Sequence, residues 1–121
     1  MSSHADLAAG RWQTLTLAEQ LANVGSEVDR AIRAWEARRS DRLERALERA
    51  LELFDLTVKD ERWRGHRRRE ILRVREEFCR LFFDDDVPQD SARGLSKYFL
   101  QFGVLAQRRG SAAPGSTAAS G

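Results

Sequence analysis

The sequence predicts an all-α protein with the architecture of an antiparallel up-down four-helix bundle. The first observation is a run from Leu17 to Trp35 whose apolar residues recur at alternating steps of four and three, the spacing of one stripe along an α-helix. The second is that three later stretches repeat this spacing, and the third is that no stretch alternates as a β-strand does. The first stripe comprises Leu17, Leu21, Val24, Val28, Ile32 and Trp35.

The first helix has a clear start signal. Thr16 stands three residues before Glu19, an arrangement in which each side chain accepts a hydrogen bond from a backbone N–H of the first turn. We expect the helix to run to about Arg38, and Ser40 or Asp41 to cap the next helix. Because this connection is short, the first two helices should be antiparallel neighbours.

The second and third helices follow from the same pattern. The second should span about Asp41 to Val58, and its broad apolar arc consists of Leu43, Ala46, Leu47, Ala50, Leu51, Leu53 and Phe54. The third helix has the stripe Ile71, Val74, Phe78, Leu81 and Phe82. Trp63 falls in register with that stripe, so we expect this helix to begin before its arginines, with Trp63 over the end of the bundle.

The third helix should end before Pro88, because proline restricts the preceding residue and cannot donate a helical hydrogen bond. Asp90 or Ser91 should then cap the fourth helix, whose stripe is Leu95, Tyr98, Phe99, Phe102, Leu105 and Ala106. From Gly110 onward the chain is rich in small residues, which bury too little apolar surface to offset the entropy of ordering. We therefore expect a flexible segment at residues 1–13, the four-helix bundle at 14–109 and a disordered tail at 110–121.

Composition sets limits on location and partners. The 121 residues suffice for one domain, and a net charge of +2 with interleaved signs is too small to require a nucleic-acid partner. Cys79 is the only cysteine, which excludes an internal disulfide and suits a reducing cytosol. The start of the chain lacks the pattern of a signal peptide, and no apolar run approaches the roughly 20 residues of a membrane span. We expect a cytoplasmic protein with no membrane partner.

An arginine cluster is the strongest candidate binding site in the sequence. It comprises Arg62, Arg64, Arg67, Arg68 and Arg69. Arginine forks bind phosphate in a bidentate manner, so the cluster could follow a nucleic-acid backbone. The alternative is a solvated helix surface, and the helical spacings Arg73–Glu77 and Glu76–Arg80 favour it because they predict ion pairs immediately beyond the cluster.

Motifs for catalysis or metal binding are missing from the sequence. The run 84–86 consists of aspartates that could hold a divalent cation, but it lacks the alternation and the closing glutamate of a calcium loop, so we interpret it as a polar loop. Cys79 and His66 do not have the spacing of metal ligands, and no nucleophile motif occurs. We therefore predict no cofactor, no metal, no small-molecule substrate and no enzymatic activity.

Several apolar or small residues lie off the stripes that form the core. Leu100 and Val104 point away from the fourth stripe, and Leu56 falls outside the arc of the second helix. A strip of small residues beside the first stripe would allow another helix to approach closely. Scattered surface apolar residues are ordinary, but their presence on three helices favours a self-association surface. The expected oligomer interface is Ala18, Ala22, Gly25, Leu56, Leu100 and Val104.

Three segments, at 18–28, 48–57 and 98–102, resemble a group of uncharacterised small bacterial proteins. This group is similar in architecture to the four-helix-bundle proteins encoded in 23S ribosomal RNA intervening sequences and to the accessory variability proteins of diversity-generating retroelements. The resemblance covers about Thr14 to Arg109, and it is specific for the first group and loose for the other two. It implies an up-down bundle that assembles into a pentameric ring and carries no catalytic residue. The retroelement proteins bind a reverse transcriptase and nucleic acid through basic ring surfaces.

Two functions follow from these observations. The first is a non-enzymatic, self-assembling helical scaffold or adaptor, which the surplus apolar surface and the missing catalytic motifs favour. The alternative is a nucleic-acid-binding accessory protein that acts through the arginine cluster at the start of the third helix. The alternative predicts an affinity that falls steeply with salt, because phosphate neutralisation releases counterions.

Overall fold

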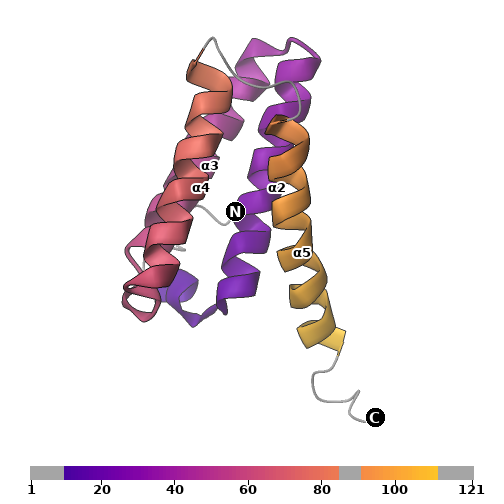
Figure 1. The fold of residues 1–121 in the computed structure, drawn as a ribbon. Helices are drawn as coiled ribbons and strands as arrows, with labels where there is room; N and C mark the ends of the chain where they lie inside the picture. Colours follow the sequence, from indigo (N-terminus) through magenta and orange to yellow (C-terminus); the bar gives the residue numbers. More distant parts are fainter. Residues whose placement is uncertain (1–9, 85–90, 112–121) are drawn as a thin grey trace.

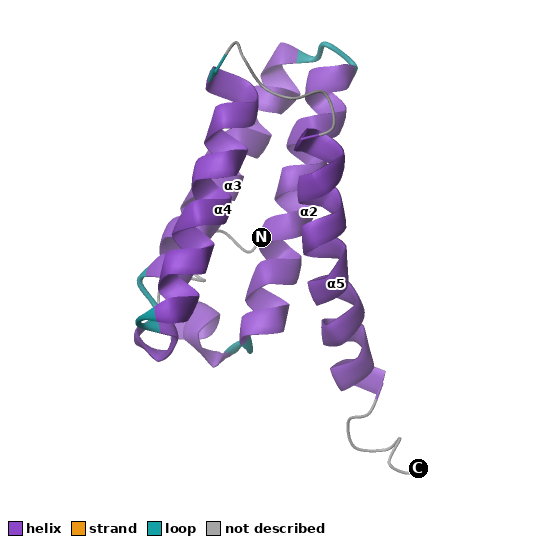
Figure 2. Cartoon of the chain, in the orientation of Figure 1, coloured by secondary structure: helices purple, strands orange, loops and turns teal. Residues whose placement is uncertain are grey.

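The computed structural model describes residues 10–84 and 91–111, and in these ranges the chain forms helices and no strand (Figure 2). The elements are the short 3₁₀ helix η2 (Trp12–Thr14), the helices α2 (Leu17–Glu36) and α3 (Ser40–Val58), the 3₁₀ helix η3 (Glu61–Trp63), and the helices α4 (His66–Phe83) and α5 (Ser91–Ser111). The four α-helices confirm the predicted all-α class and are consistent with a four-helix bundle. None of the helices described is both long and apolar enough to cross a membrane.

Helix α2 is the main packing partner in the fold. It packs along α3 and along α5, while α4 contacts both α3 and α5. Figure 1 shows that α5 diverges from α2 toward its C-terminal end. The C-terminal half of α5 is therefore less covered than its N-terminal half, where Leu95 and Phe99 are buried.

The first helix begins as the sequence predicts. The backbone N–H of Thr16 donates to Glu19 Oε1 at 2.8 Å, and the backbone N–H of Glu19 donates to Thr16 Oγ1 at 3.1 Å. The helix ends at Glu36, and the backbone N–H groups of Arg38 and Arg39 close its last turn. Arg38 has φ 56°, a left-handed conformation that glycine usually supplies at this place.

The core lies between the apolar stripes of the four helices. Leu21, Val24, Val28 and Ile32 of the first stripe are buried, whereas Trp35 is largely exposed and makes an edge-to-face contact with Phe82. Aromatic rings join the other three helices. Phe54 of α3 lies 5.6 Å from Phe78 of α4 and 6.1 Å from Phe99 of α5, measured between ring centroids.

Trp12 lies in the core, although the sequence predicts a flexible segment at residues 1–13. It belongs to η2 and is only 1% exposed, because the bundle accepts its large apolar ring and satisfies its N–H. At the other end, α5 continues through Gly110 to Ser111, beyond the predicted boundary. The remaining expectations for residues 1–9 and 112–121, and for Asp85, Asp86, Pro88 and the Asp90 cap, lie outside the residues that the structure describes.

Two helix starts also differ from the prediction. Helix α3 begins at Ser40 with Arg39 at its N-cap position, where no side chain makes a capping hydrogen bond, so the expected Ser40 or Asp41 cap is wrong. Helix α4 begins at His66 rather than before the arginines, because Gly65 at φ 82° separates it from η3. Trp63 belongs to η3 and packs, half-buried, against the core.

Candidate functional site

The predicted arginine cluster lies where η3 leads into α4, and three of its five members have partners within the chain. Arg62 Nη2 donates to Asp60 Oδ2 and to the Leu15 carbonyl, each at 2.7 Å. Arg64 forms an exposed ion pair with Glu61 at 3.2 Å. These contacts hold η3 and the neighbouring loop in place.

Of the other three members, one side chain makes a hydrogen bond within the chain and two do not. Arg68 Nη2 donates to the Asp60 carbonyl at 3.2 Å, and its Nε is buried without a partner. The side chains of Arg67 and Arg69 are exposed and make no hydrogen bond or ion pair within the described residues. Further along α4, Arg80 pairs with Asp84 at 3.4 Å. Neither of the predicted pairs, Arg73–Glu77 and Glu76–Arg80, is formed within the described residues.

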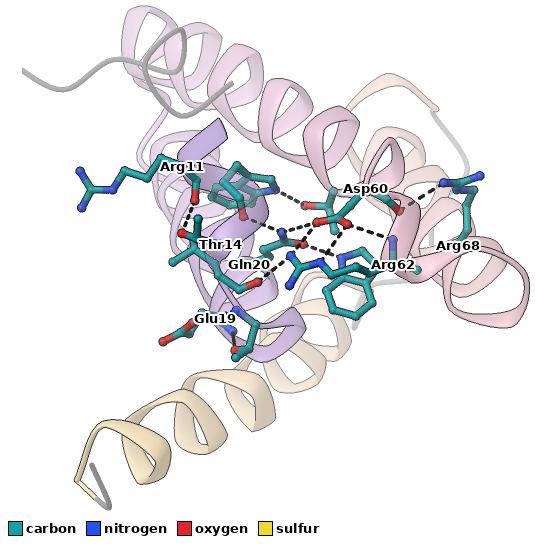
Figure 3. A network of polar contacts seen from close by, with 12 residues as sticks. Arg11, Thr14, Glu19, Gln20, Asp60, Arg62 and Arg68 are labelled. Carbon is teal, nitrogen blue, oxygen red and sulfur yellow. Dashed lines mark hydrogen bonds and ion pairs between the residues drawn. The ribbon is translucent and has the colours of Figure 1, made fainter. Parts of the chain in front are cut away.

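Asp60 is the centre of a buried polar network that no local pattern in the sequence predicts. Its side chain is 3% exposed and accepts hydrogen bonds from Arg62 and from Gln20 Nε2, the latter at 2.9 Å (Figure 3). Gln20 Nε2 also donates to the Trp12 carbonyl at 2.8 Å, and its Oε1 accepts from Trp63 Nε1 at 2.8 Å. The side-chain amide of Gln20 thus links α2 to η2 and to η3.

The network extends to the end of α3 through Thr57. Trp12 Nε1 donates to Thr57 Oγ1 at 3.2 Å, and that hydroxyl donates to the Leu53 carbonyl at 2.8 Å. The hydrogen bond from the Arg62 guanidinium lowers the pKa of Asp60 to about 2, against the opposing effect of burial. We call the set Trp12, Gln20, Thr57, Asp60, Arg62 and Trp63 the polar hub. Its hydrogen bonds join segments of one chain, which marks it as an element of the fold.

A second basic site lies between the C-terminal half of α2 and the N-terminal half of α3. It is a groove with a volume of about 490 Å³, and six arginines and three alanines line it. We call it the arginine groove. Its lining is Arg30, Arg33, Ala34, Ala37, Arg39, Arg42, Arg45, Ala46 and Arg49.

Helical spacing explains why these residues meet. Positions 30, 33 and 34 of α2 share one face with its C-cap residue at 37, and positions 42, 45, 46 and 49 share one face of α3. Ala34 and Ala46 are buried between the two helices, and their small side chains leave the space that the arginines border. Each face is visible in the sequence, but their convergence depends on how the two helices pack.

Glu27 fixes one end of the arginine groove. Its buried carboxylate accepts from Arg30 Nη1 at 2.7 Å and from Arg49 Nε at 3.2 Å. Both of these arginines are thereby oriented. The other four, Arg33, Arg39, Arg42 and Arg45, have no ion pair within the part of the chain that the structure describes.

Part of the predicted oligomer interface lies inside the single chain. Gly25 is buried against α5, and a Cβ atom added to it would lie 2.6 Å from Phe99 Cβ. Ala18 and Ala22 of the same strip are half-buried. Leu56 is also half-buried and packs against the core. At Gly25 the small-residue strip therefore admits a helix of the same chain.

The other two predicted interface residues are exposed. Leu100 is 64% and Val104 41% exposed, and Leu105, which helical spacing predicts to lie in the core stripe, is 45% exposed. Together with polar and basic neighbours they border a shallow hollow on α5. We call this surface the α5 patch. It consists of Lys97, Leu100, Gln101, Val104, Leu105 and Arg108.

Helix α4 carries a second exposed apolar surface. Leu72 is 46% and Phe83 64% exposed, and they share one helix face with the half-buried Cys79 and the exposed Glu76. We call these four residues the α4 stripe. It differs from the α5 patch in charge, because it contains a carboxylate where the α5 patch contains two cations.

No three His, Cys, Asp or Glu side chains come together as metal ligands within residues 10–84 and 91–111. Comparisons with models of known protein families, with curated proteins and with solved structures gave no match.

Proposed function

We propose that the chain is a non-enzymatic, self-assembling helical scaffold or adaptor, built as an antiparallel up-down bundle and assembled into a ring. The observation that carries this proposal is the α5 patch, where three large apolar side chains lie open to solvent on one helix face. Contiguous exposed apolar surface on a small protein commonly contacts a partner. The resemblance to ring-forming four-helix-bundle proteins supports the same assembly.

The partner that best fits the α5 patch is the α4 stripe of a second copy. Lys97 and Arg108 flank the patch, and the exposed Glu76 lies within the stripe, so this carboxylate can pair with one of the two cations. Two different surfaces in contact make a head-to-tail interface. Such an interface generates a ring when its rotation closes.

Light scattering coupled to size exclusion tests the proposal over a range of concentrations. We expect the wild-type chain to be oligomeric at micromolar concentration, and the double variant Leu100→Glu/Val104→Glu to be monomeric with an unchanged helical circular dichroism spectrum. The matched control Gln13→Glu/Ser26→Glu adds two negative charges at exposed positions outside α4 and α5 and should keep the wild-type mass. A monomeric wild-type protein would rule out the scaffold.

The second candidate function is nucleic-acid binding through the arginine cluster. Arg67 and Arg69 support it, because they are exposed and have no partner within the described residues. It ranks second because Arg62, Arg64 and Arg68 already have partners in the chain. Absence of RNA and DNA binding at low salt would dispose of it.

A further inference from the structure

We propose that the arginine groove binds a compact oligophosphate, meaning a small ligand with several linked phosphate groups. This site is separate from the arginine cluster on α4 and from the apolar surfaces assigned to self-assembly. The proposal therefore does not depend on the oligomeric state. Three properties of the groove carry it: its size, the chemistry of its walls and its lack of compensating charge.

The size and the wall chemistry select the class of ligand. A volume of about 490 Å³ lies in the range of small-molecule sites, roughly 300 to 1,000 Å³. The side chains of the walls are guanidinium groups and alanine methyl groups, so the side-chain polar atoms are all hydrogen-bond donors. An oligophosphate presents only acceptors and concentrates several negative charges in a small volume, and arginine forks bind such oxygens in pairs.

Most of the positive charge of the groove is not neutralised by ion pairs. No carboxylate lines it, and four of its six arginines have no ion pair within the described residues. Like charges that converge in a concave surface raise the local potential and attract anions. Arg30 and Arg49 are oriented by Glu27, so part of the binding geometry exists before a ligand arrives.

The turn beside the groove adds another arginine under backbone strain. Arg38 has φ 56° and lines an adjoining hollow with Arg39, Arg42 and Arg45, although Asp41 also lies there. A left-handed arginine where glycine fits better is a strained feature, and such features concentrate at functional sites. Arg38 thus adds one more cation in the hollow that adjoins the groove.

The lining also distinguishes an oligophosphate from a nucleic acid. Proteins that bind single strands use aromatic side chains on which bases stack, and no aromatic residue lines this groove. An oligophosphate needs no such platform, because its recognition depends on charge and on hydrogen bonds to oxygen.

Isothermal titration of the full chain with inorganic tripolyphosphate, in buffer without divalent cations, tests the proposal. The groove variant Arg42→Gln/Arg45→Gln should bind roughly tenfold or more weakly than the wild type. The matched control Arg67→Gln/Arg69→Gln removes two equally exposed and unpaired charges from α4 and should change affinity less than about twofold. A second groove variant, Arg33→Gln, repeats the test on α2, and circular dichroism verifies that each variant is folded.

Several results would overturn the proposal. If the groove variant and the control variant lost affinity for tripolyphosphate equally, binding would depend only on the net charge of the protein. Orthophosphate that binds as tightly as tripolyphosphate would show that the groove does not recognise linked phosphates. Tight binding of a single-stranded oligonucleotide through Arg42 and Arg45, without binding of tripolyphosphate, would assign the groove to nucleic acid instead.

Discussion

At the scale of the residue, Gly25 sets how closely α2 and α5 approach. We predict that Gly25→Ala destabilises the fold by about 1–3 kcal/mol, because the new Cβ would lie 2.6 Å from Phe99 Cβ and overpack the contact. This loss should exceed the gain in helix propensity from glycine to alanine, about 1 kcal/mol. Urea denaturation of the variant and the wild type measures the difference.

Gly103 provides the matched control for Gly25. It also lies within a helix, but nothing comes within 4 Å of the Cβ that alanine would add. Gly103→Ala should therefore stabilise the fold by up to about 1 kcal/mol. If both variants shifted the urea midpoint in the same direction, the close contact between α2 and α5 would be contradicted.

Single residues also show the limits of the sequence pattern. The capping box of Thr16 and Glu19 could be predicted because it depends on residues three positions apart. The roles of Trp12 and Gln20 could not, because their side-chain partners lie 45 and 40 positions away along the chain. A buried polar side chain finds a partner across the fold, and no local spacing records that partner.

At the scale of the element, the polar hub joins η2 and α2 to the end of α3 and to η3. We predict that it makes stability depend on pH through Asp60, whose folded-state pKa of about 2 lies below its ordinary value near 3.9. A depressed folded-state pKa contributes stability above the unfolded pKa that is lost as the pH falls through the folded pKa. The wild type should lose about 2 kcal/mol from this group between pH 5 and pH 2.

Urea denaturation at pH 5 and pH 2 measures this dependence. Asp60→Asn has no carboxylate to protonate, so its stability should change with pH by about 2 kcal/mol less than that of the wild type. Thr57→Val provides the control, because it leaves Trp12 Nε1 without its acceptor but removes no ionisable group. It should lower stability by about 1–3 kcal/mol at both pH values. If the stability of Asp60→Asn changed between pH 5 and pH 2 as much as that of the wild type, Asp60 would not be the source of the pH dependence.

The helices themselves were largely predictable, because apolar spacing reports one face of a helix directly. The boundaries of the helices were less predictable. Helix α3 starts without a side-chain cap, since the preceding turn is fixed by backbone hydrogen bonds to α2 and by the left-handed Arg38. Helix α4 starts late, since Gly65 and the contacts of Asp60 hold η3 as a separate turn.

At the scale of the whole molecule, the two proposed binding surfaces differ in how visible they are in the sequence. Leu100 and Val104 could be identified because both lie off the stripe of their own helix, and the structure confirms that they are exposed. The arginine groove could not be identified, because it exists only where faces of α2 and α3 converge over Ala34 and Ala46. A surface on one helix is a property of local spacing, whereas a groove is a property of packing.

The proposed head-to-tail contact makes a prediction that a symmetric contact does not. Leu72→Glu should disable the α4 stripe and leave the α5 patch intact, and Leu100→Glu should do the reverse. Each variant alone should be monomeric, because every head-to-tail contact needs one surface of each kind. An equimolar mixture should form a dimer of one copy of each variant, which cannot grow because the remaining surfaces are defective.

Native mass spectrometry of the mixture, with one variant isotopically labelled, distinguishes this dimer from either variant paired with itself. Ser26→Glu should leave the wild-type assembly unchanged, which controls for an added charge on an exposed helix face. If the α5 patch instead contacted the α5 patch of a second copy about a two-fold axis, Leu72→Glu would still form dimers. Mixing the two variants would then not restore assembly to Leu100→Glu. That result would exclude a ring built through α4 and α5, since a single self-complementary surface closes at the dimer.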